Sequence, residues 1–134
     1  MKALYAISTV AIIAACSGTP EVPEETLVIR DYVEVGELQT VDKVRTYNND
    51  SWSYLSDYFV IYKSRNDEYL LEFRRVCREL RDSQLLTADR RSDHNAMYVG
   101  LDTLRGCRIG KMYPLTEAQA IELRHLGHAP GEGN

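Results

Sequence analysis

The sequence has none of the short motifs that mark the common enzyme classes. It contains no glycine-rich phosphate loop, no P-loop and no GxSxG nucleophile motif, so the activities built on those motifs are not predicted. The carboxylates are scattered along the chain and do not form a pair that would flank a cleft. The sequence therefore assigns no catalytic residue by motif.

A surface charge of one sign is also missing. The chain of 134 residues carries a formal net charge of −4, and its acidic and basic residues are interspersed. Domains that bind nucleic acid usually carry a basic stripe, and none stands out here. Nucleic acid is therefore not a predicted partner.

Residues that bind metals are few and dispersed. The chain has three cysteines and three histidines, and no CxxC motif. His125 and His128 are three residues apart, but Gly127 is expected to break the helix between them. We predict that both histidines lie on the surface at a helix end, and we predict no metal and no cofactor.

Asp93 and His94 form the one pair with a possible catalytic role. An Asp–His dyad can orient a general base, which would suit an envelope hydrolase or transferase. Adjacent residues rarely form such a dyad, however, and no nucleophile accompanies this one. The enzyme is therefore the alternative hypothesis.

The first fifteen residues predict export. Lys2 precedes an apolar run of about a dozen residues that ends in small residues, which is the pattern of a secretory signal. The run is too short to span a bilayer comfortably, and a buried N-terminal strand or helix is the alternative. Ile13–Cys16 resembles a bacterial lipobox, in which the cysteine is lipidated, and Ser17 resembles the next residue of lipoproteins sorted to the outer membrane. We predict a lipid anchor at Cys16 on the periplasmic side of the outer membrane.

The rest of the chain is long enough for one domain. Residues 16–26 are acidic and contain prolines, so they are predicted to form a tether that begins at the lipidated cysteine. Residues 27–128 are predicted to form one globular domain, and residues 129–134 a disordered tail.

The cysteine count fits this compartment. If Cys16 carries lipid, Cys77 and Cys107 remain as an even pair in an oxidising environment, where a disulfide is expected. Two free buried thiols are the alternative. A metal site is less favoured, because no cluster of ligands accompanies either cysteine.

Two runs rich in β-forming residues, Tyr58–Tyr62 and Tyr69–Phe73, predict a hairpin across a polar turn. We place Asn66-Asp67 at the centre of the turn, which sets Tyr62 opposite Leu71. In this register one face of the hairpin lies in the core and the other face is mixed.

Other elements follow from shorter patterns. We predict a short helix within Leu27–Leu38, and a bend or helical turn that begins near Arg74. Further segments are predicted as strands at Thr40–Tyr47, Ser51–Leu55, Gln84–Thr87, Tyr98–Leu101 and Cys107–Tyr113, and as an exposed loop at Ala88–Asn95. In the last strand neither alternating face is uniformly apolar, which is typical of a curved sheet covered on both sides.

The C-terminal helix has the clearest local signal. Thr116–Gln119 forms a capping box, and Gly127 is placed to end the helix as the C′ residue. Ile121, Leu123 and Leu126 are expected to form the apolar side. Together these elements predict a single α+β domain. It would have a curled, mostly antiparallel sheet of about five or six strands and a C-terminal helix, stapled by one disulfide.

Tyrosine is unusually frequent, with nine residues in the chain. Trp52, Tyr54 and Tyr58 fall in predicted strands and form a possible binding surface, an aromatic platform for a glycan or a peptide. The alternative is that these side chains form the core and rim of a small sheet.

Several segments, taken as an ordered set, resemble a known family of small uncharacterised lipoproteins of Gram-negative bacteria, grouped as a domain of unknown function. The segments are Ile29–Tyr32, Val41–Arg45, Trp52–Tyr62, Tyr69–Phe73 with Cys77, and Asp102–Ile109. The resemblance covers most of residues 27–128. It implies an exported domain with paired cysteines and no established activity, and it supplies no catalytic residues.

We therefore expect a non-enzymatic binding or accessory protein of the cell envelope. It would be held at the membrane through its lipid anchor, and its partner would be another envelope protein or a cell-wall component.

Overall fold

The computed structural model describes residues 22–47, 50–81, 88–89 and 95–127 of the chain. Its elements in chain order are α1 (Glu24–Val35), β1 (Lys43–Arg45), β2 (Ser51–Ser56), β3 (Phe59–Ser64), β4 (Asp67–Phe73), a 3-10 helix η1 (Arg78–Leu80), β5 (Ala88–Asp89), β6 (Ala96–Tyr98), β7 (Thr103–Leu104), β8 (Cys107–Leu115) and α2 (Glu117–Leu126).

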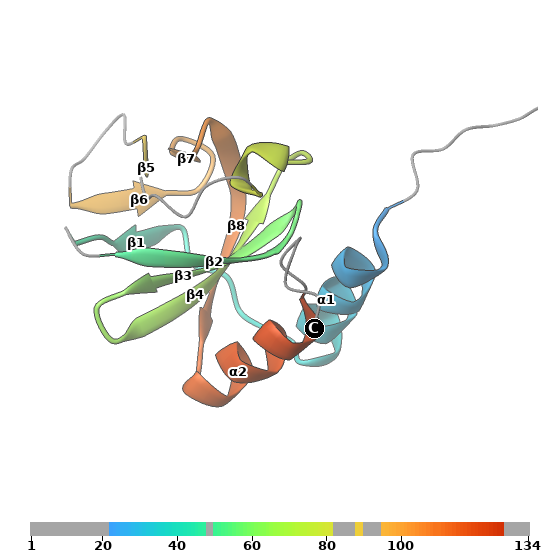
Figure 1. The fold of residues 1–134 in the computed structure, drawn as a ribbon. Helices are drawn as coiled ribbons and strands as arrows, with labels where there is room; N and C mark the ends of the chain where they lie inside the picture. Colours follow the sequence, from blue (N-terminus) through green and yellow to red (C-terminus); the bar gives the residue numbers. More distant parts are fainter. Residues whose placement is uncertain (1–21, 48–49, 82–87, 90–94, 128–134) are drawn as a thin grey trace, which may run out of the picture.

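Antiparallel pairing joins these strands into two sheets. Within the described residues, one sheet has six strands in the order β2-β3-β4-β8-β7-β5, and β1 pairs with β6 in a second, two-stranded sheet. The large sheet is curled, and α1 and α2 lie together on the side away from the small sheet (Figure 1). The predicted α+β fold with a curled antiparallel sheet, a C-terminal helix and one disulfide is confirmed.

The large sheet is covered on both faces, so the molecule has two apolar cores. The small-sheet core lies between the large sheet and β1-β6, and the helix-side core lies between the large sheet and the two helices. The small-sheet core contains Val44, Val60, Tyr62, Leu71, Phe73, Cys77, Leu80, Met97, Leu104, Ile109 and Met112. The helix-side core contains Ile29, Leu55, Phe59, Ile61, Leu70, Tyr113, Ala120 and Leu123.

The predicted hairpin is present, but its predicted register is wrong by two residues. Tyr62 lies opposite Tyr69, and the turn is centred on Arg65-Asn66. The observed register pairs Lys63 with Glu68 across the strands, whereas the predicted one would have set Lys63 opposite an apolar residue. Opposite charges across a strand pair are favourable. Because the shift is an even number of residues, the side chains still point to the predicted faces.

The observed turn requires Arg65 to adopt a φ of 56°, which is uncommon for a residue other than glycine. The Arg65 guanidinium carbon lies 4.3 Å from the centroid of the Tyr47 ring. Such a cation–π contact is favourable and offsets part of the conformational cost.

The short helix predicted within Leu27–Leu38 is confirmed as α1, which begins at Glu24. Glu24 and Glu25 occupy its first turn, where negative charge is favoured by the helix dipole. Thr26 is buried, and its hydroxyl donates to Ser56 Oγ at 3.0 Å. The helix therefore contacts β2 from its first turn onward.

The predicted capping box at the start of α2 is confirmed. Gln119 N–H donates to Thr116 Oγ1 at 3.2 Å, and Thr116 N–H donates to Gln119 Oε1 at 2.9 Å. Leu123 is buried as predicted, but Ile121 is 48% exposed, because the turn of the helix directs it away from the sheet.

Gly127 ends α2, but not in the left-handed conformation that a C′ glycine usually adopts. Its φ is −87° and its ψ is 152°, an extended backbone that any residue can adopt. A Cβ at this position would lie 2.8 Å from the Cα and Cβ of Leu55. The glycine is therefore required by the close approach of the chain to β2.

The predicted strand Tyr98–Leu101 is wrong beyond Tyr98. The Tyr98 carbonyl accepts from the amides of Leu101 and Asp102, and Asp102 Oδ2 accepts from the Tyr98 amide at 2.7 Å. Asp102 is fully buried, so it closes a turn that an alternation pattern does not show. Gly100 accommodates this turn with a φ of 79°.

Two other predictions differ from the structure, one in the length of a strand and one in the type of element. The strand predicted at Thr40–Tyr47 is limited to β1, with Val41 forming a separate bridge to Met112. Ala88–Asp89, predicted to belong to a loop, pairs with β7 as β5. The predicted strand Gln84–Thr87, the remainder of the predicted loop up to residue 94, and the tail 129–134 lie outside the described residues.

Candidate functional site

The predicted disulfide is present and is confirmed. Cys77 and Cys107 are bonded, and their Cα atoms are 5.9 Å apart. Cys77 is completely buried in the small-sheet core, whereas Cys107 is partly exposed at the start of β8. The bond therefore joins the segment after β4 to the first residue of β8, at the molecular surface.

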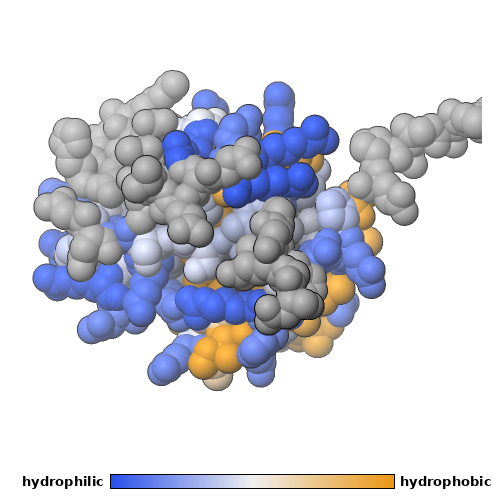
Figure 2. All heavy atoms as spheres, viewed as in Figure 1, coloured by the Kyte–Doolittle hydropathy of each residue, from blue (hydrophilic) through white to orange (hydrophobic). Residues whose placement is uncertain are grey.

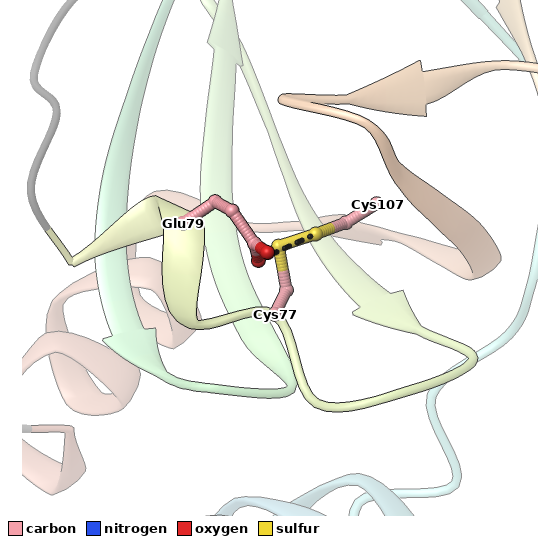
Figure 3. A group of neighbouring side chains, drawn as sticks. All are labelled: Cys77, Glu79 and Cys107. Carbon is pink, nitrogen blue, oxygen red and sulfur yellow. Dashed lines mark hydrogen bonds between the residues drawn. A yellow bond between two sulfur atoms is a disulfide. The ribbon is translucent and has the colours of Figure 1, made fainter.

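A cleft of about 480 Å³ opens beside this disulfide. We call it the arginine cleft, because three of its seven lining residues are arginines. It is lined by Arg74, Arg75, Val76, Glu79, Gly106, Cys107 and Arg108. Figure 3 shows the Glu79 carboxylate directed at the two sulfur atoms, with Glu79 on η1 and the cysteines on the two sides of the bond.

A β-bulge lies next to the cleft. Glu72 pairs with Lys111 and Phe73 with Ile109, so Gly110 has no partner on β4. The bulge turns Ile109 into the small-sheet core while Tyr113 lies in the helix-side core. This extra residue explains why the sequence of the strand has no uniformly apolar face.

Arg74 lies against the bulge and two glycines. The Arg74 amide donates to the Arg108 carbonyl at 3.1 Å, so the two arginines are neighbours on adjacent segments of the backbone. A Cβ on Gly110 would lie 3.0 Å from Arg74 Cγ, and one on Gly100 would lie 3.0 Å from Arg74 Nη2. The Arg74 side chain therefore runs across Gly110 and ends beside Gly100.

The charge of the cleft is unbalanced. Within the described part of the chain, Arg74, Arg75 and Arg108 form no ion pair, and Glu79 is the only acidic residue in the lining. Glu79 Oε2 lies 3.5 Å from Cys107 Sγ. Because the bonded sulfur has no proton to donate, this approach is a contact and does not neutralise the carboxylate.

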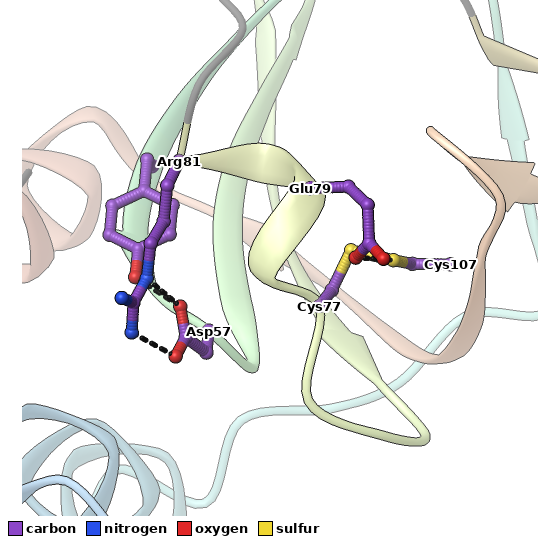
Figure 4. The surroundings of a disulfide bond; sticks show 6 residues. Asp57, Cys77, Glu79, Arg81 and Cys107 are labelled. Atoms are coloured by element: carbon purple, nitrogen blue, oxygen red, sulfur yellow. Dashed lines mark hydrogen bonds and ion pairs between the residues drawn. A yellow bond between two sulfur atoms is a disulfide. The ribbon is translucent and has the colours of Figure 1, made fainter.

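A hydrogen-bonded carboxylate holds the segment that carries Glu79. Asp57, in the β2–β3 turn, is 4% exposed and accepts from Arg81 Nε at 2.6 Å and from Tyr54 Oη at 2.6 Å. Arg81 Nη2 also donates to Asp57, and the Asp57 carbonyl accepts from the Cys77 amide at 2.7 Å. Figure 4 shows this pair and the disulfide on the two sides of η1.

The same contacts shift three pKa values. Burial alone would raise the pKa of Asp57, but the hydrogen bonds from Arg81 and Tyr54 outweigh it and hold the pKa below its usual value. Burial, followed by the bond to Asp57, raises the pKa of Tyr54 to about 12. The bond to Asp57 raises the pKa of Arg81. At neutral pH Asp57 is therefore a carboxylate, Arg81 is positively charged and Tyr54 is a neutral phenol.

The three aromatic residues proposed as a binding surface do not line one face. Trp52 and Tyr54 pack against the small-sheet core, whereas Tyr58 packs against the helix-side core. The Arg30 guanidinium carbon lies 4.9 Å from the centroid of the Tyr58 ring. The indole Nε1 of Trp52 is buried and has no hydrogen-bond partner within the described residues.

Three other predicted site residues, Cys16, Asp93 and His94, lie outside the described residues. Of the two histidines expected at the helix end, His125 is exposed in the last turn of α2, and His128 also lies outside the described residues.

One carboxylate and two sulfur atoms lie close enough to be considered as metal ligands. Ligand atoms of Cys77, Glu79 and Cys107 are within 4.8 Å of one another. Both sulfurs are in the disulfide, however, and metal binding by cysteine requires thiolates. The oxidised protein therefore does not offer this set to a metal.

Apolar side chains are exposed mainly on the helices. Leu27 is 53% exposed and Val35 76% on α1, and Figure 2 shows hydrophobic atoms gathered around the two helices on an otherwise hydrophilic face. A hollow of about 370 Å³ lies here, with Tyr32 and Leu126 in its lining. No helix within the described residues is long and apolar enough to cross a membrane.

The fold and the cleft define a class, namely small α+β domains with one disulfide and a basic cleft beside it. The model of a family of unknown function, DUF6491, matches residues 1–127. The chain belongs to this family. No curated protein and no solved structure matches the chain.

The cysteine pair was identifiable from the sequence, but the arginines were missed. Arg74 and Arg75 precede Cys77 by a few residues, and Arg108 directly follows Cys107. Once the disulfide is assumed, these positions place positive charge on both sides of it. That proximity of arginines to paired cysteines is a sequence signal for a basic site even where no continuous basic stripe is present.

Proposed function

We propose that this protein is a lipid-anchored binding protein of the Gram-negative cell envelope, without enzymatic activity of its own. Residues 1–15 would be removed as a signal peptide, and lipid on Cys16 would hold the domain on the periplasmic side of the outer membrane. The arginine cleft would bind a component of the envelope, either another protein or a cell-wall component.

The observation that carries the binding role is the open arginine cleft beside the disulfide. A guanidinium group stays protonated at all physiological pH values, so the three arginines are suited to hold an anionic group and not to transfer protons. Among the described residues of the lining, Glu79 is the only carboxylate. This composition favours recognition over acid–base chemistry.

The disulfide supports the proposed location in the periplasm. Disulfides persist in oxidising environments such as the bacterial periplasm and are rare in the cytosol. The bond between Cys77 and Cys107 leaves Cys16 as the one remaining cysteine of the chain. That cysteine follows the predicted signal directly, where a lipobox cysteine is expected.

The anchor can be tested by replacing Cys16 with alanine in the full-length chain and fractionating the cells. We expect the wild-type protein in the outer-membrane fraction and the Cys16→Ala variant outside it, because the variant has no cysteine to lipidate. Ser17→Asp is the matched variant, which keeps the lipid and should move the protein to the inner membrane. A Cys16→Ala variant that remains in the outer membrane would rule out this anchor.

A further inference from the structure

We propose that the arginine cleft binds a phosphate group, carried either by a soluble ester or by a lipid headgroup. This inference rests on the proposed binding role of the cleft and names a phosphate ester or a phospholipid headgroup as its ligand, in place of a protein or a cell-wall component. It does not depend on the lipid anchor, because it concerns only the residues of the cleft.

The arginines of the cleft repel one another electrostatically. Arg74 and Arg108 are joined by a backbone hydrogen bond and both line the cleft, with Arg75 beside them. Like charges on neighbouring strands destabilise a sheet, and within the described residues no carboxylate pairs with these three arginines. Folding alone does not require three unpaired arginines to lie together, and a bound anion would reduce the repulsion among them.

The charge and the size of the cleft match those of a phosphate group. Three arginines and one glutamate give the lining a formal charge of 3 − 1 = +2. A phosphate monoester carries roughly −1.5 to −2 at neutral pH, whereas a single carboxylate carries −1. The planar guanidinium group forms paired hydrogen bonds with phosphate oxygens. A volume of about 480 Å³ is also in the range of small-ligand sites.

The backbone segments that carry the arginines and Glu79 are held in place before a ligand arrives. Arg74 lies against Gly110 and Gly100. The disulfide joins the two segments of the chain that carry the arginines, and the bond from Arg81 to Asp57 anchors the segment of Glu79. Donors that are already positioned lose less entropy on binding.

The test uses full-length protein in detergent at low ionic strength, with inorganic phosphate and glycerol phosphate as probes. Binding is followed by the ³¹P line width and by the thermal unfolding midpoint. We expect wild-type protein to broaden the line and to unfold at higher temperature as phosphate is added. No broadening and no thermal shift at millimolar phosphate would exclude a soluble ester as the ligand and leave the lipid headgroup, which the vesicle experiment below tests.

Three variants are expected to weaken phosphate binding, to tighten it and to leave it unchanged. Arg108→Gln should weaken phosphate binding by about tenfold to a hundredfold, the usual effect of losing hydrogen bonds to a charged group. Without phosphate it should unfold at or above the wild-type temperature, because the repulsion is reduced. Glu79→Gln should tighten binding by removing the one negative charge of the lining. Arg45→Gln, on β1 away from the cleft, has the same charge change as Arg108→Gln and should leave the affinity unchanged. Equal affinity of Arg108→Gln and wild type would contradict the site.

The source of the phosphate can be separated with the Cys16→Ala variant, which cannot attach to vesicles through its lipid. Binding of soluble glycerol phosphate supports the proposal and assigns a soluble ester. Binding only to vesicles that contain phosphatidic acid, whose headgroup is a phosphate monoester, supports it and assigns a lipid headgroup. Binding to neither would overturn it, and the result of the Cys16 fractionation would still stand.

Discussion

Replacement of both Cys77 and Cys107 by serine is expected to lower the free energy of unfolding by about 3–4 kcal/mol. The two cysteines are 30 residues apart, and the bond restricts the unfolded chain by closing a loop of that length. Cys77 is completely buried in the small-sheet core, so a serine there would also bury a hydroxyl group, which adds to the loss.

Urea unfolding, followed through the fluorescence of the single tryptophan Trp52, measures this effect. Wild-type protein treated with a dithiol reductant should approach the stability of the double variant, because both lack the bond. Cys16→Ala is the matched control and should keep the wild-type stability, since it leaves the pair intact. A double variant within about 0.5 kcal/mol of wild type would show that the bond does not support the fold.

The second large effect is expected from Asp57→Asn, which should cost about 2–3 kcal/mol by weakening the charged hydrogen bonds from Arg81 and Tyr54. The lost charge also removes a dependence on pH. The folded state holds the pKa of Asp57 below its usual value. Its contribution is therefore present above the unfolded pKa of about 3.9 and is lost as the pH falls through the lower folded pKa.

The measurement is the free energy of unfolding at several pH values between about 2 and 7. Wild-type protein should lose stability below about pH 4, and Asp57→Asn should lose less over the same interval. Asp31→Asn is the control, because Asp31 is exposed on α1 and should leave both the stability and the acid slope unchanged. Identical acid slopes for wild type and Asp57→Asn would contradict the role of this pair.

Features that depend on a few neighbouring residues were predictable from the sequence. The capping box at Thr116–Gln119 needs only four residues, and the structure has both of its hydrogen bonds. The bend after Phe73 was predictable because a straight strand would have buried Arg75 without a partner. The disulfide followed from the number of cysteines that remain after Cys16.

Features that depend on pairing between distant segments were not predictable. The observed register of the hairpin sets Lys63 opposite Glu68 and brings Arg65 against Tyr47, and a turn propensity contains neither contact. The two-residue strands β5 and β7 are too short to show any periodicity. The cover on both faces of the sheet also depends on how β1 and β6 meet.

The candidate site was predictable in part for the same reason. Its disulfide follows from composition and compartment. Its charge does not, because Arg74 and Arg108 become neighbours only through the pairing of β4 with β8 and the bulge at Gly110. The carboxylate that supports the cleft, Asp57, lies in a turn where its residue type is common and gives no special signal.

We propose that the disulfide-bonded chain is exported and lipid-anchored. The most direct test is the intact mass of the protein extracted from membranes, with and without reduction before alkylation. We predict that residues 1–15 are absent, that Cys16 carries lipid, and that Cys77 and Cys107 react with the alkylating reagent only after reduction. A full-length chain with three reactive thiols would contradict this account.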